Sequence, residues 1–258
     1  MRIAALQHDI VWEDAAATCT RVAPMIAEAA TDGAQMVLLT EMFGPGFSLA
    51  ADRIAEPPGG PTEQFMAGQA AAHDIWVGGS IPVRDAPAAD SNALPVNRFL
   101  LVGPDGTRHQ YDKLHPFTFA DEHEAYRAGD TPVTVTIDGL RLTLFVCYDL
   151  RFANVFWDRA LDTDAYLVVA NWPQSRRTHW SALLVARAIE NQAYVVGVNR
   201  VGEANGLTYS GDTVIIDPSG EVVASGVDHT EGVVMAEMDP GRVAEVRDTF
   251  RFLPDRRD

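Results

Sequence analysis

Two hydrophobic patterns alternate along the chain from residue 2 to about residue 250. Short apolar runs such as QMVLLT predict buried strands, and segments with apolar residues every three or four positions predict helices. The predicted strands are 2–7, 35–40, 75–81, 97–103, 107–111, 131–137, 141–146, 165–170 and 193–199, with further strands between 208 and 237. The predicted helices are 14–31, 62–73, 152–161, 178–191 and 240–249. This alternation, with mostly buried strands, is typical of an α/β layered fold.

Loops rich in glycine, proline and polar residues separate these elements without dividing the chain. The stretch GPGFSLAADRIAEPPGGP follows the second predicted strand, and the polar loop at 84–95 is the best candidate for a mobile segment. No low-complexity linker interrupts the pattern. We therefore predict a single domain over residues 1–258, built from two halves of similar style.

Composition and charge narrow the classes of function. The formal net charge of −16, from 36 acidic and 20 basic residues, disfavours nucleic acid and anionic membrane surfaces as partners. No apolar window approaches the roughly 18 residues of a membrane-spanning helix. The first apolar run is broken by Gln7, His8 and Asp9, too early for a secretory signal. We therefore expect a cytoplasmic protein.

The counts of cysteine and lysine direct attention to single residues. Cys19 and Cys147 are the two cysteines, and their isolation predicts neither a disulfide framework nor a zinc site. Of the 20 basic residues, only Lys113 is a lysine. Arginine is a planar fork, whereas lysine is a compact point charge. A lone lysine in an arginine-rich chain therefore points to a position that requires a small ammonium group.

Cys147 and Glu41 stand where strands end. A buried strand runs into Cys147 in LTLFVCYDLRF, and a helix is expected just after it, so the following backbone N–H groups can lower a thiol pKa and bind an oxyanion. The alternative is a buried, inert cysteine. Glu41 follows QMVLLT at the carboxyl end of a strand, where ligands bind in α/β sheets. It is a candidate general base or, alternatively, a solvated loop acid.

Lys113, in YDKLHPF, follows a short strand, and Glu122 lies nine residues further on in ADEHEAYRAGD. The alternative interpretation is a charged, solvated loop that contains Asp121, Glu122 and Glu124. His115 and His123 are alternative bases for Cys147, although a Cys–His pair cannot be recognised from spacing. We rank both histidines below Glu41.

The order Glu, Lys, Glu, Cys in LLTEMF, YDKLHPF, ADEHEAYRAGD and FVCYDLRF resembles the nitrilase (carbon–nitrogen hydrolase) superfamily. The later stretch ANWPQSRRTHWSALLVARAIENQAYVVGVNRVG is similar to that superfamily too, and together these motifs resemble its ω-amidase (2-oxoglutaramate amidase) branch. The resemblance implies a four-layer αββα sandwich that forms homodimers through outer helices. It also implies a Glu41–Lys113–Cys147 triad with Glu122 as a second glutamate, and no metal or organic cofactor.

The implied reaction is hydrolysis of a small-molecule amide. Cys147 forms a thioester, Glu41 carries protons to and from the reacting groups, and Lys113 with the Tyr148 backbone N–H stabilises the oxyanion. Ammonia and a carboxylic acid are released. Glu122 holds Lys113 or the substrate amide in position.

Other residues are candidates for the pocket wall. Phe43, Phe117 and Trp172 either line it or belong to the core. Arg176 and Arg177 either bind a substrate carboxylate or form a solvated basic pair. Arg151 is either a buried structural ion pair, which we favour, or an anion clamp.

Substrate choice stays open, because GPGFSLAADR and the loop 84–95 depart from the ω-amidase pattern. The alternatives are an amidase or N-carbamoyl hydrolase with another small substrate, a non-enzymatic interaction protein that retains the fold, and a Cys–His hydrolase dependent on His115 or His179. A dinucleotide-binding module is set aside because the first strand is not followed by GxGxxG.

Overall fold

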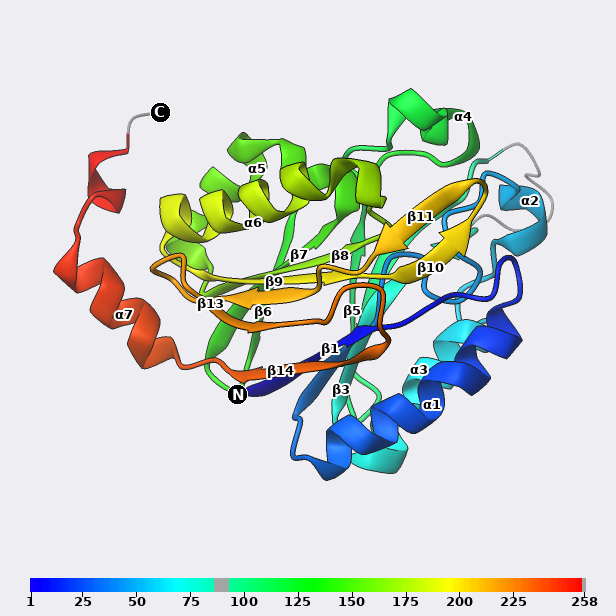
Figure 1. The fold of residues 1–258 in the computed structure, drawn as a ribbon, viewed down its shortest axis with the longest axis horizontal. Helices are drawn as coiled ribbons and strands as arrows, with labels where there is room; N and C mark the ends of the chain where they lie inside the picture. The colour runs from blue at the N-terminus through cyan, green and yellow to red at the C-terminus, as the bar shows by residue number, and fades with distance from the viewer. Residues whose placement is uncertain (86–92, 257–258) are drawn as a thin grey trace.

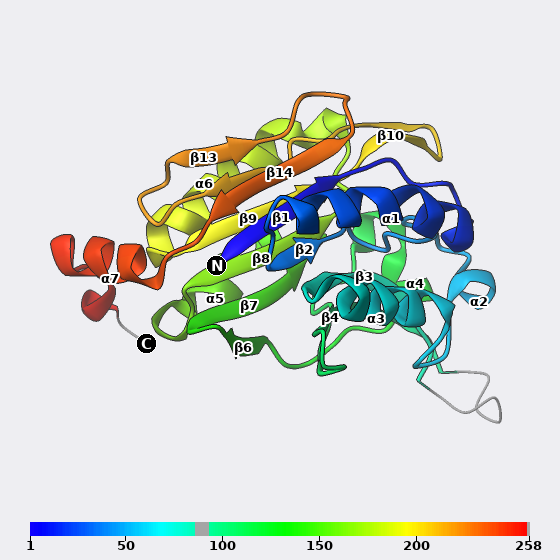
Figure 2. The same cartoon turned by 90° about the horizontal axis from the view of Figure 1, so that it is seen from below.

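The computed structural model describes residues 1–85 and 93–256. Within these ranges two six-stranded sheets face each other, with helices on both outer sides (Figures 1 and 2). The four-layer αββα sandwich is therefore confirmed. Most of the loop 84–95, which we predicted to be mobile, lies outside the described residues.

The first sheet has the strand order β14-β1-β2-β3-β4-β5. Strands β1, β2 and β3 run parallel, and β14, β4 and β5 extend the sheet in antiparallel pairs. The bounds are β14 Gly232–Glu237, β1 Arg2–Gln7, β2 Met36–Leu38, β3 Trp76–Val83, β4 Val96–Val102 and β5 Arg108–Asp112.

The second sheet has the order β13-β12-β9-β8-β7-β6 and repeats this design, with β7, β8 and β9 parallel at its centre. The bounds are β13 Val222–Ser225, β12 Val214–Ile216, β9 Tyr194–Asn199, β8 Ala165–Ala170, β7 Leu140–Val146 and β6 Val133–Ile137. A separate hairpin, β10 Val201–Ala204 with β11 Leu207–Ser210, stands apart from both sheets.

Helices cover the outer faces of the sheets. Figure 1 shows α1 and α3 on the first sheet and α5 and α6 on the second, while α7 extends from one end of the body. The bounds are α1 Ala15–Thr31, α2 Ala51–Ile54, α3 Pro61–His73, α4 Glu122–Ala125, α5 Ala153–Trp157, α6 Arg177–Asn191 and α7 Pro240–Thr249. No helix of the described ranges is long and apolar enough to cross a bilayer.

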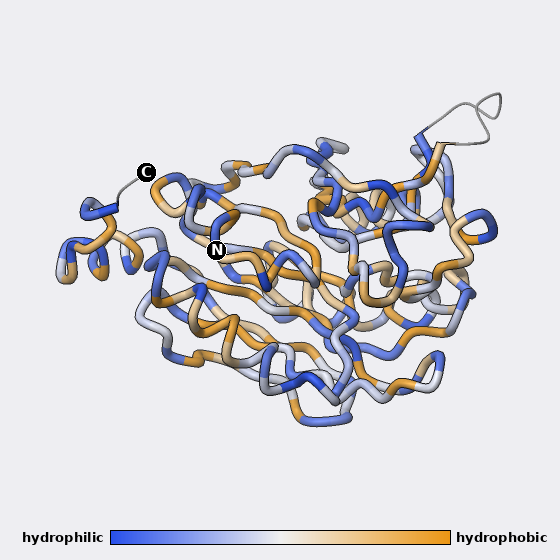
Figure 3. The backbone as a smooth tube through the Cα atoms, turned by 90° about the horizontal axis from the view of Figure 1, so that it is seen from above, coloured by the Kyte–Doolittle hydropathy of each residue, from blue (hydrophilic) through white to orange (hydrophobic). Residues whose placement is uncertain are grey.

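The alternation of side chains along β1 shows how the layers are joined. Ile3 and Ala5 point into the core between the two sheets, whereas Ala4 and Leu6 pack against the helices α1 and α3. A strand with both faces buried reads as a continuous apolar run, which is why the pattern predicted these strands well. Figure 3 shows the hydrophobic segments running through the middle of the fold.

Helix α1 follows its sequence signals closely. Asp14 caps it by accepting a hydrogen bond from the Ala17 amide at 2.9 Å, and Val22, Ile26 and Ala29 form its buried stripe.

The predicted helix 152–161 is wrong in its second half, because α5 ends at Trp157 and a 3₁₀ turn follows at Ala160–Asp162. The carbonyls of Ala160 and Thr163 accept hydrogen bonds from Arg247 of α7. These hydrogen bonds connect the segment after α5 to α7.

Candidate active site

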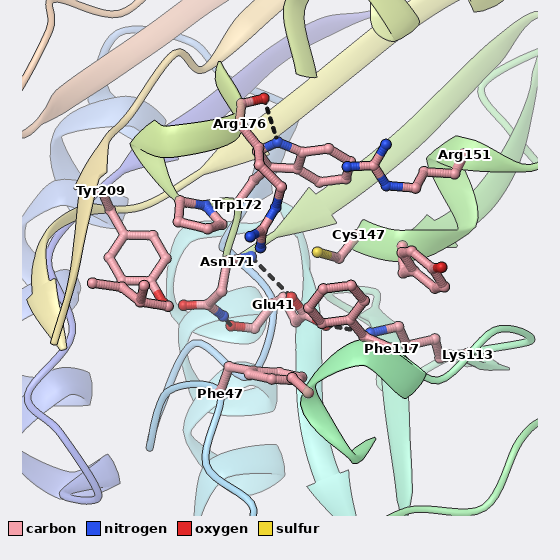
Figure 4. A pocket seen from close by; sticks show the side chains of 14 residues that line it. Glu41, Phe47, Lys113, Phe117, Cys147, Arg151, Asn171, Trp172, Arg176 and Tyr209 are labelled. Carbon is pink, nitrogen blue, oxygen red and sulfur yellow. Dashed lines mark hydrogen bonds and ion pairs between the residues drawn. The ribbon is translucent and has the colours of Figure 1, made fainter. Parts of the chain in front are cut away.

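Both sheets deliver polar side chains to one place. Glu41 follows β2 and Lys113 follows β5 of the first sheet, whereas Cys147 follows β7 and Asn171 follows β8 of the second. All four line one pocket. In Figure 4 Glu41, Lys113 and Cys147 converge at its base. Carboxyl ends of strands are the usual ligand-binding edge of α/β sheets.

Lys113 forms the centre of a buried ion cluster. Its Nζ donates to Glu41 Oε1 at 2.9 Å and to the two carboxylate oxygens of Glu122 at 3.1 and 2.8 Å. The Lys113 side chain is 1% exposed, and both glutamates are completely buried. A compact ammonium reaching three oxygens is the arrangement that the lone lysine suggested.

Two asparagines add further hydrogen bonds to Glu41. Asn97 Nδ2 donates to Glu41 Oε1 at 2.9 Å, and the Asn171 backbone N–H donates to Glu41 Oε2 at 2.9 Å. The side chain of Asn171 donates to the Glu41 carbonyl as well. Glu41 is thus fixed through its main chain and both carboxylate oxygens.

The charge cluster shifts the ionisation of its members. Burial alone would lower the pKa of Lys113, but the carboxylates of Glu122 and Glu41 outweigh it, and the pKa is raised. Burial raises the pKa of Glu122 against the opposing effect of Lys113. Burial, together with the negative charge of Glu41, also raises the pKa of the Cys147 thiol well above its usual value. At rest Cys147 is therefore a neutral thiol beside the Glu41 carboxylate, rather than a thiolate.

Cys147 lies on a strained turn. Its φ is +47°, and a 3₁₀ helix over Cys147–Arg151 follows directly, where we had expected an α-helix. The tight turn leaves the thiol facing the pocket, partly exposed. Left-handed backbone at a residue with a side chain costs of order 1 kcal/mol or more and persists only where its surroundings enforce it.

Asp149 is the residue that enforces this turn. Its carboxylate accepts from the Val146 amide at 3.0 Å, from the Tyr111 hydroxyl at 2.7 Å and from the His115 amide at 3.0 Å. It also contacts His115 Nδ1 at 2.8 Å. Because Tyr111 and His115 flank Lys113, one buried carboxylate links the turn at Cys147 to the segment that carries Lys113. His115 does not line the pocket that contains Cys147, and neither do His123 and His179.

The pocket continues outward from this base, with an empty volume of about 480 Å³ including the space open to solvent. Its lining consists of Glu41, Phe47, Lys113, Phe117, Ala120, Cys147, Tyr148, Arg151, Asn171, Trp172, Pro173, Arg176, Leu207 and Tyr209. Phe117, Tyr148, Trp172 and Arg176 are thus where the sequence predicted them.

Two arginines of the wall rest on aromatic rings (Figure 4). The guanidinium of Arg176 lies 5.3 Å from the ring centroid of Phe117, and that of Arg151 lies 4.7 Å from the ring of Trp172. Our preferred interpretation of Arg151 as a buried ion pair is wrong. Among the described residues its polar partner is His179, at 3.3 Å, and no carboxylate lies within ion-pair distance.

Arg177 and Phe43 lie elsewhere. Arg177 forms ion pairs with Asp212 and Asp228 and does not line the pocket. Phe43 is completely buried in the core between the first sheet and its helices. The expectation that Phe43 walls the pocket is wrong, because the left-handed Met42, with φ of +40°, turns the chain after Glu41.

Several site residues escaped the sequence analysis: Phe47, Asn97, Asp149, Asn171, Leu207 and Tyr209. Asn171 follows a buried strand as Glu41 does, and Asn97 is a polar position inside the apolar strand VNRFLLV, so both carried a signal. Tyr209 and Leu207 come from the β10–β11 hairpin, and nothing local marks them.

The chain was compared with known proteins after this geometry was established. A model described as carbon–nitrogen hydrolase matches residues 2–248. The chain belongs to the carbon–nitrogen hydrolase family. This hydrolase is 42% identical to the omega-amidase YafV of Escherichia coli (strain K12), over 97% of its own length and 94% of that protein. It is 32% identical to a 2-oxoglutaramate amidase of Bacillus subtilis (strain 168), over 98% and 96% respectively.

A solved structure gives the same answer. The hydrolase matches XC1258 from Xanthomonas campestris, a CN-hydrolase superfamily protein with an arsenic adduct in its active site, with a TM-score of 0.93. The two are 36% identical, and the match covers 100% of this chain and 97% of the other. The predicted superfamily, fold and amide-hydrolysing activity are confirmed.

Proposed function

We propose that this carbon–nitrogen hydrolase cleaves ω-amides of dicarboxylic or 2-oxo acids, with Cys147 as the nucleophile. The observation that carries the proposal is the position of the thiol at the base of a pocket, beside a buried carboxylate and a buried ammonium. An amide carbon is a poor electrophile, so its cleavage needs an activated nucleophile and a stabilised oxyanion.

The hydrogen bonds of Glu41 support its role as the base. A carboxylate oxygen accepts about two hydrogen bonds. Oε1 already accepts from Lys113 and Asn97, whereas Oε2 accepts from the Asn171 amide and, as far as the described residues go, retains one free acceptor position. That position takes the thiol proton as Sγ attacks the amide carbon of the substrate.

The remaining steps follow from the same groups. Lys113 Nζ and the Tyr148 backbone N–H stabilise the tetrahedral oxyanion. Glu41 returns its proton to the nitrogen, the C–N bond breaks, and ammonia leaves a thioester on Cys147. Glu41 then takes a proton from water, the resulting hydroxyl attacks the thioester carbonyl, and the acid departs as the thiol is restored. Glu122 keeps the lysine in place with both of its oxygens.

The substrate class rests on the wall of the pocket. Arg151 and Arg176 both line it, and no carboxylate of the described residues lies within ion-pair distance of either guanidinium. A carboxylate on the substrate would supply that partner, at the end of the molecule away from the amide. The relatives named as an omega-amidase and a 2-oxoglutaramate amidase act in keeping with this substrate class.

Ammonia release from a panel of amides tests the proposal. The panel contains 2-oxoglutaramate, succinamate, simple aliphatic amides and N-carbamoyl amino acids. We expect release from the two carboxylate-bearing ω-amides and a loss of about 10⁴-fold or more in Cys147→Ala. Release from aliphatic amides or carbamoyl compounds alone would overturn the substrate class. Undiminished release in Cys147→Ala would overturn the mechanism.

We also propose that residues 1–258 act as one domain in a cytoplasmic homodimer. Ile189 on α6 is 49% exposed and Phe250, after α7, is 68% exposed, so apolar surface is available on the outer helices for a second copy. A reducing compartment would keep the free thiol of Cys147 active. Light scattering on the purified protein should give twice the mass of one chain. The mass of a single chain would contradict the proposed homodimer.

A further inference from the structure

A neutral amide lies between the two buried carboxylates of the site. Asn97 Nδ2 donates to Glu41 Oε1 at 2.9 Å and to Glu122 Oε1 at 3.3 Å. Asn97 is 1% exposed and projects from β4, the strand that neighbours β5. It does not line the pocket, so it reaches the reaction only through the two glutamates.

The orientation of this amide is fixed by a second side chain. Ser80 Oγ accepts a hydrogen bond from the Met42 amide at 2.8 Å and donates to Asn97 Oδ1 at 2.7 Å. The Ser80 hydroxyl has one hydrogen, which it can donate only to an acceptor. Asn97 Oδ1 is therefore held toward Ser80, and Nδ2 is held toward the carboxylates. These hydrogen bonds form a ring, because Asn97 donates to Glu41 and Met42, which donates to Ser80, is the residue after Glu41.

We propose that Asn97, oriented by Ser80, is a positioning residue that holds Glu41 in its proton-accepting geometry. The inference rests on the proposed function of Glu41 as the base. Met42, Ser80 and Asn97 connect the main chain at Glu41 with its carboxylate, so the side chain cannot rotate without breaking a buried hydrogen bond. Oε1 stays turned to Asn97 and Lys113, which leaves Oε2 as the oxygen that accepts the thiol proton in the proposed mechanism.

An amide suits this place better than other side chains. A carboxylate at this position would place a third negative charge beside those of Glu41 and Glu122, which already share the ammonium of Lys113. An apolar group would leave the oxygens without a donor in a buried environment. The ionisable groups that face the two glutamates from the surrounding elements are Lys113, Tyr126, Cys147 and Tyr209.

The test compares Asn97→Asp, which keeps the shape but removes the donor, with Ser80→Ala, which frees the amide to rotate. Asn154→Asp, at an exposed position on α5, is the matched control for the first change. The readouts are kcat and KM for the best amide of the panel from pH 5 to pH 9, and the rate at which iodoacetamide alkylates Cys147.

We expect kcat at pH 7 to fall about 100-fold in Asn97→Asp and about 10-fold in Ser80→Ala, with KM changed less than threefold. The deficit of Asn97→Asp should shrink toward pH 5, because a protonated carboxyl regains a donor. A merely structural role would lower activity equally at every pH. Alkylation of Cys147 should slow in Asn97→Asp, because the base beside the thiol is misplaced.

The outcomes separate the inference from the proposed function. Wild-type kcat and pH profile in Asn97→Asp, with Cys147→Ala inactive, would overturn the positioning role and leave the mechanism intact. Full activity in Cys147→Ala would overturn the mechanism itself. If Asn97→Asp fails to fold by circular dichroism, Ser80→Ala decides, and a wild-type kcat and pH profile there overturns the positioning role.

Discussion

The base and the wall of the pocket are built in opposite ways. At the base, Glu41, Lys113 and Glu122 are at most 1% exposed, and direct ion pairs join these three residues across different elements of the fold. At the wall, the guanidiniums of Arg151 and Arg176 lie against aromatic rings. The base is held by buried hydrogen bonds and ion pairs, whereas the wall presents charged groups to a molecule that enters the pocket.

The difference matches what the proposed function requires of each region. Proton transfer and nucleophilic attack depend on atoms placed within a few tenths of an ångström, so a fixed network is an advantage there. Recognition of a carboxylate tolerates some movement of a long arginine side chain. Changes at the base should therefore lower kcat, and changes at the wall should raise KM for particular substrates.

Among substitutions that keep Cys147, the largest effect is expected from Lys113→Arg at the base of the pocket. The substitution keeps the charge, but the planar fork is larger than an ammonium and cannot meet three oxygens that surround one nitrogen. We expect kcat to fall about 10³-fold, which is the effect of losing a preorganised oxyanion donor. Steady-state ammonia release measures it, with the exposed Arg251→Lys as control. A kcat within tenfold of wild type would show that the base is less exacting than its geometry suggests.

The same contrast explains what could be read from the sequence. Glu41, Lys113 and Cys147 each follow a strand and lie within motifs of a few residues. Buried strands can be recognised in a sequence as apolar runs. The same runs predicted an α/β layered fold, and the resemblance to the nitrilase superfamily implied its four layers. The direction of a loop side chain was not predictable even there. Phe43 follows the turn at Met42 into the core, where it packs against Phe65.

The wall and the supporting residues are set by tertiary contacts that no local pattern encodes. Phe47 lies in a glycine- and proline-rich loop, and Tyr209 reaches the pocket because the β10–β11 hairpin folds over it. Asp149 stands in the motif FVCYDLRF, but its task is to accept from Tyr111 and His115, which lie more than thirty residues away. Such partners become visible only once the two sheets are brought together.

Replacing Arg176 by glutamine sharpens the comparison at the wall, with Arg177→Gln as its neighbouring control. The side chain of Arg176 lines the pocket, whereas Arg177 is paired with Asp212 and Asp228 outside it. We expect Arg176→Gln to raise KM for 2-oxoglutaramate and succinamate by about 10- to 100-fold, the effect of losing a hydrogen bond to a charged group. KM for a neutral aliphatic amide should stay within threefold. Equal effects on charged and neutral amides would remove Arg176 from carboxylate binding.

The smallest effect on turnover is expected from replacing His8, which supports the base of the pocket through Thr40. His8 is completely buried, its Nδ1 contacts the Asp9 carbonyl at 2.9 Å, and its Nε2 contacts the hydroxyl of Thr40, the residue before Glu41, at 3.2 Å. A neutral imidazole satisfies both contacts by donating through Nδ1 and accepting through Nε2. Burial lowers the pKa of His8 from 6.5 to about 4.

This shift makes the stability of the fold depend on pH. The folded-state pKa lies below the unfolded value, so between pH 6.5 and pH 4 the unfolded chain binds the proton that the folded chain excludes. The stabilisation is complete above pH 6.5 and is lost as the pH falls through this window. From pH 7 to pH 4.5 wild type should lose about 2–3 kcal/mol more free energy of unfolding than His8→Gln, in which no imidazole titrates. Urea unfolding at the two pH values measures the difference, and kcat at pH 7 should agree within a few-fold. Identical losses in the two proteins would mean that His8 accepts a proton in the folded state, and that the network behind Glu41 is more open to water than the pocket base.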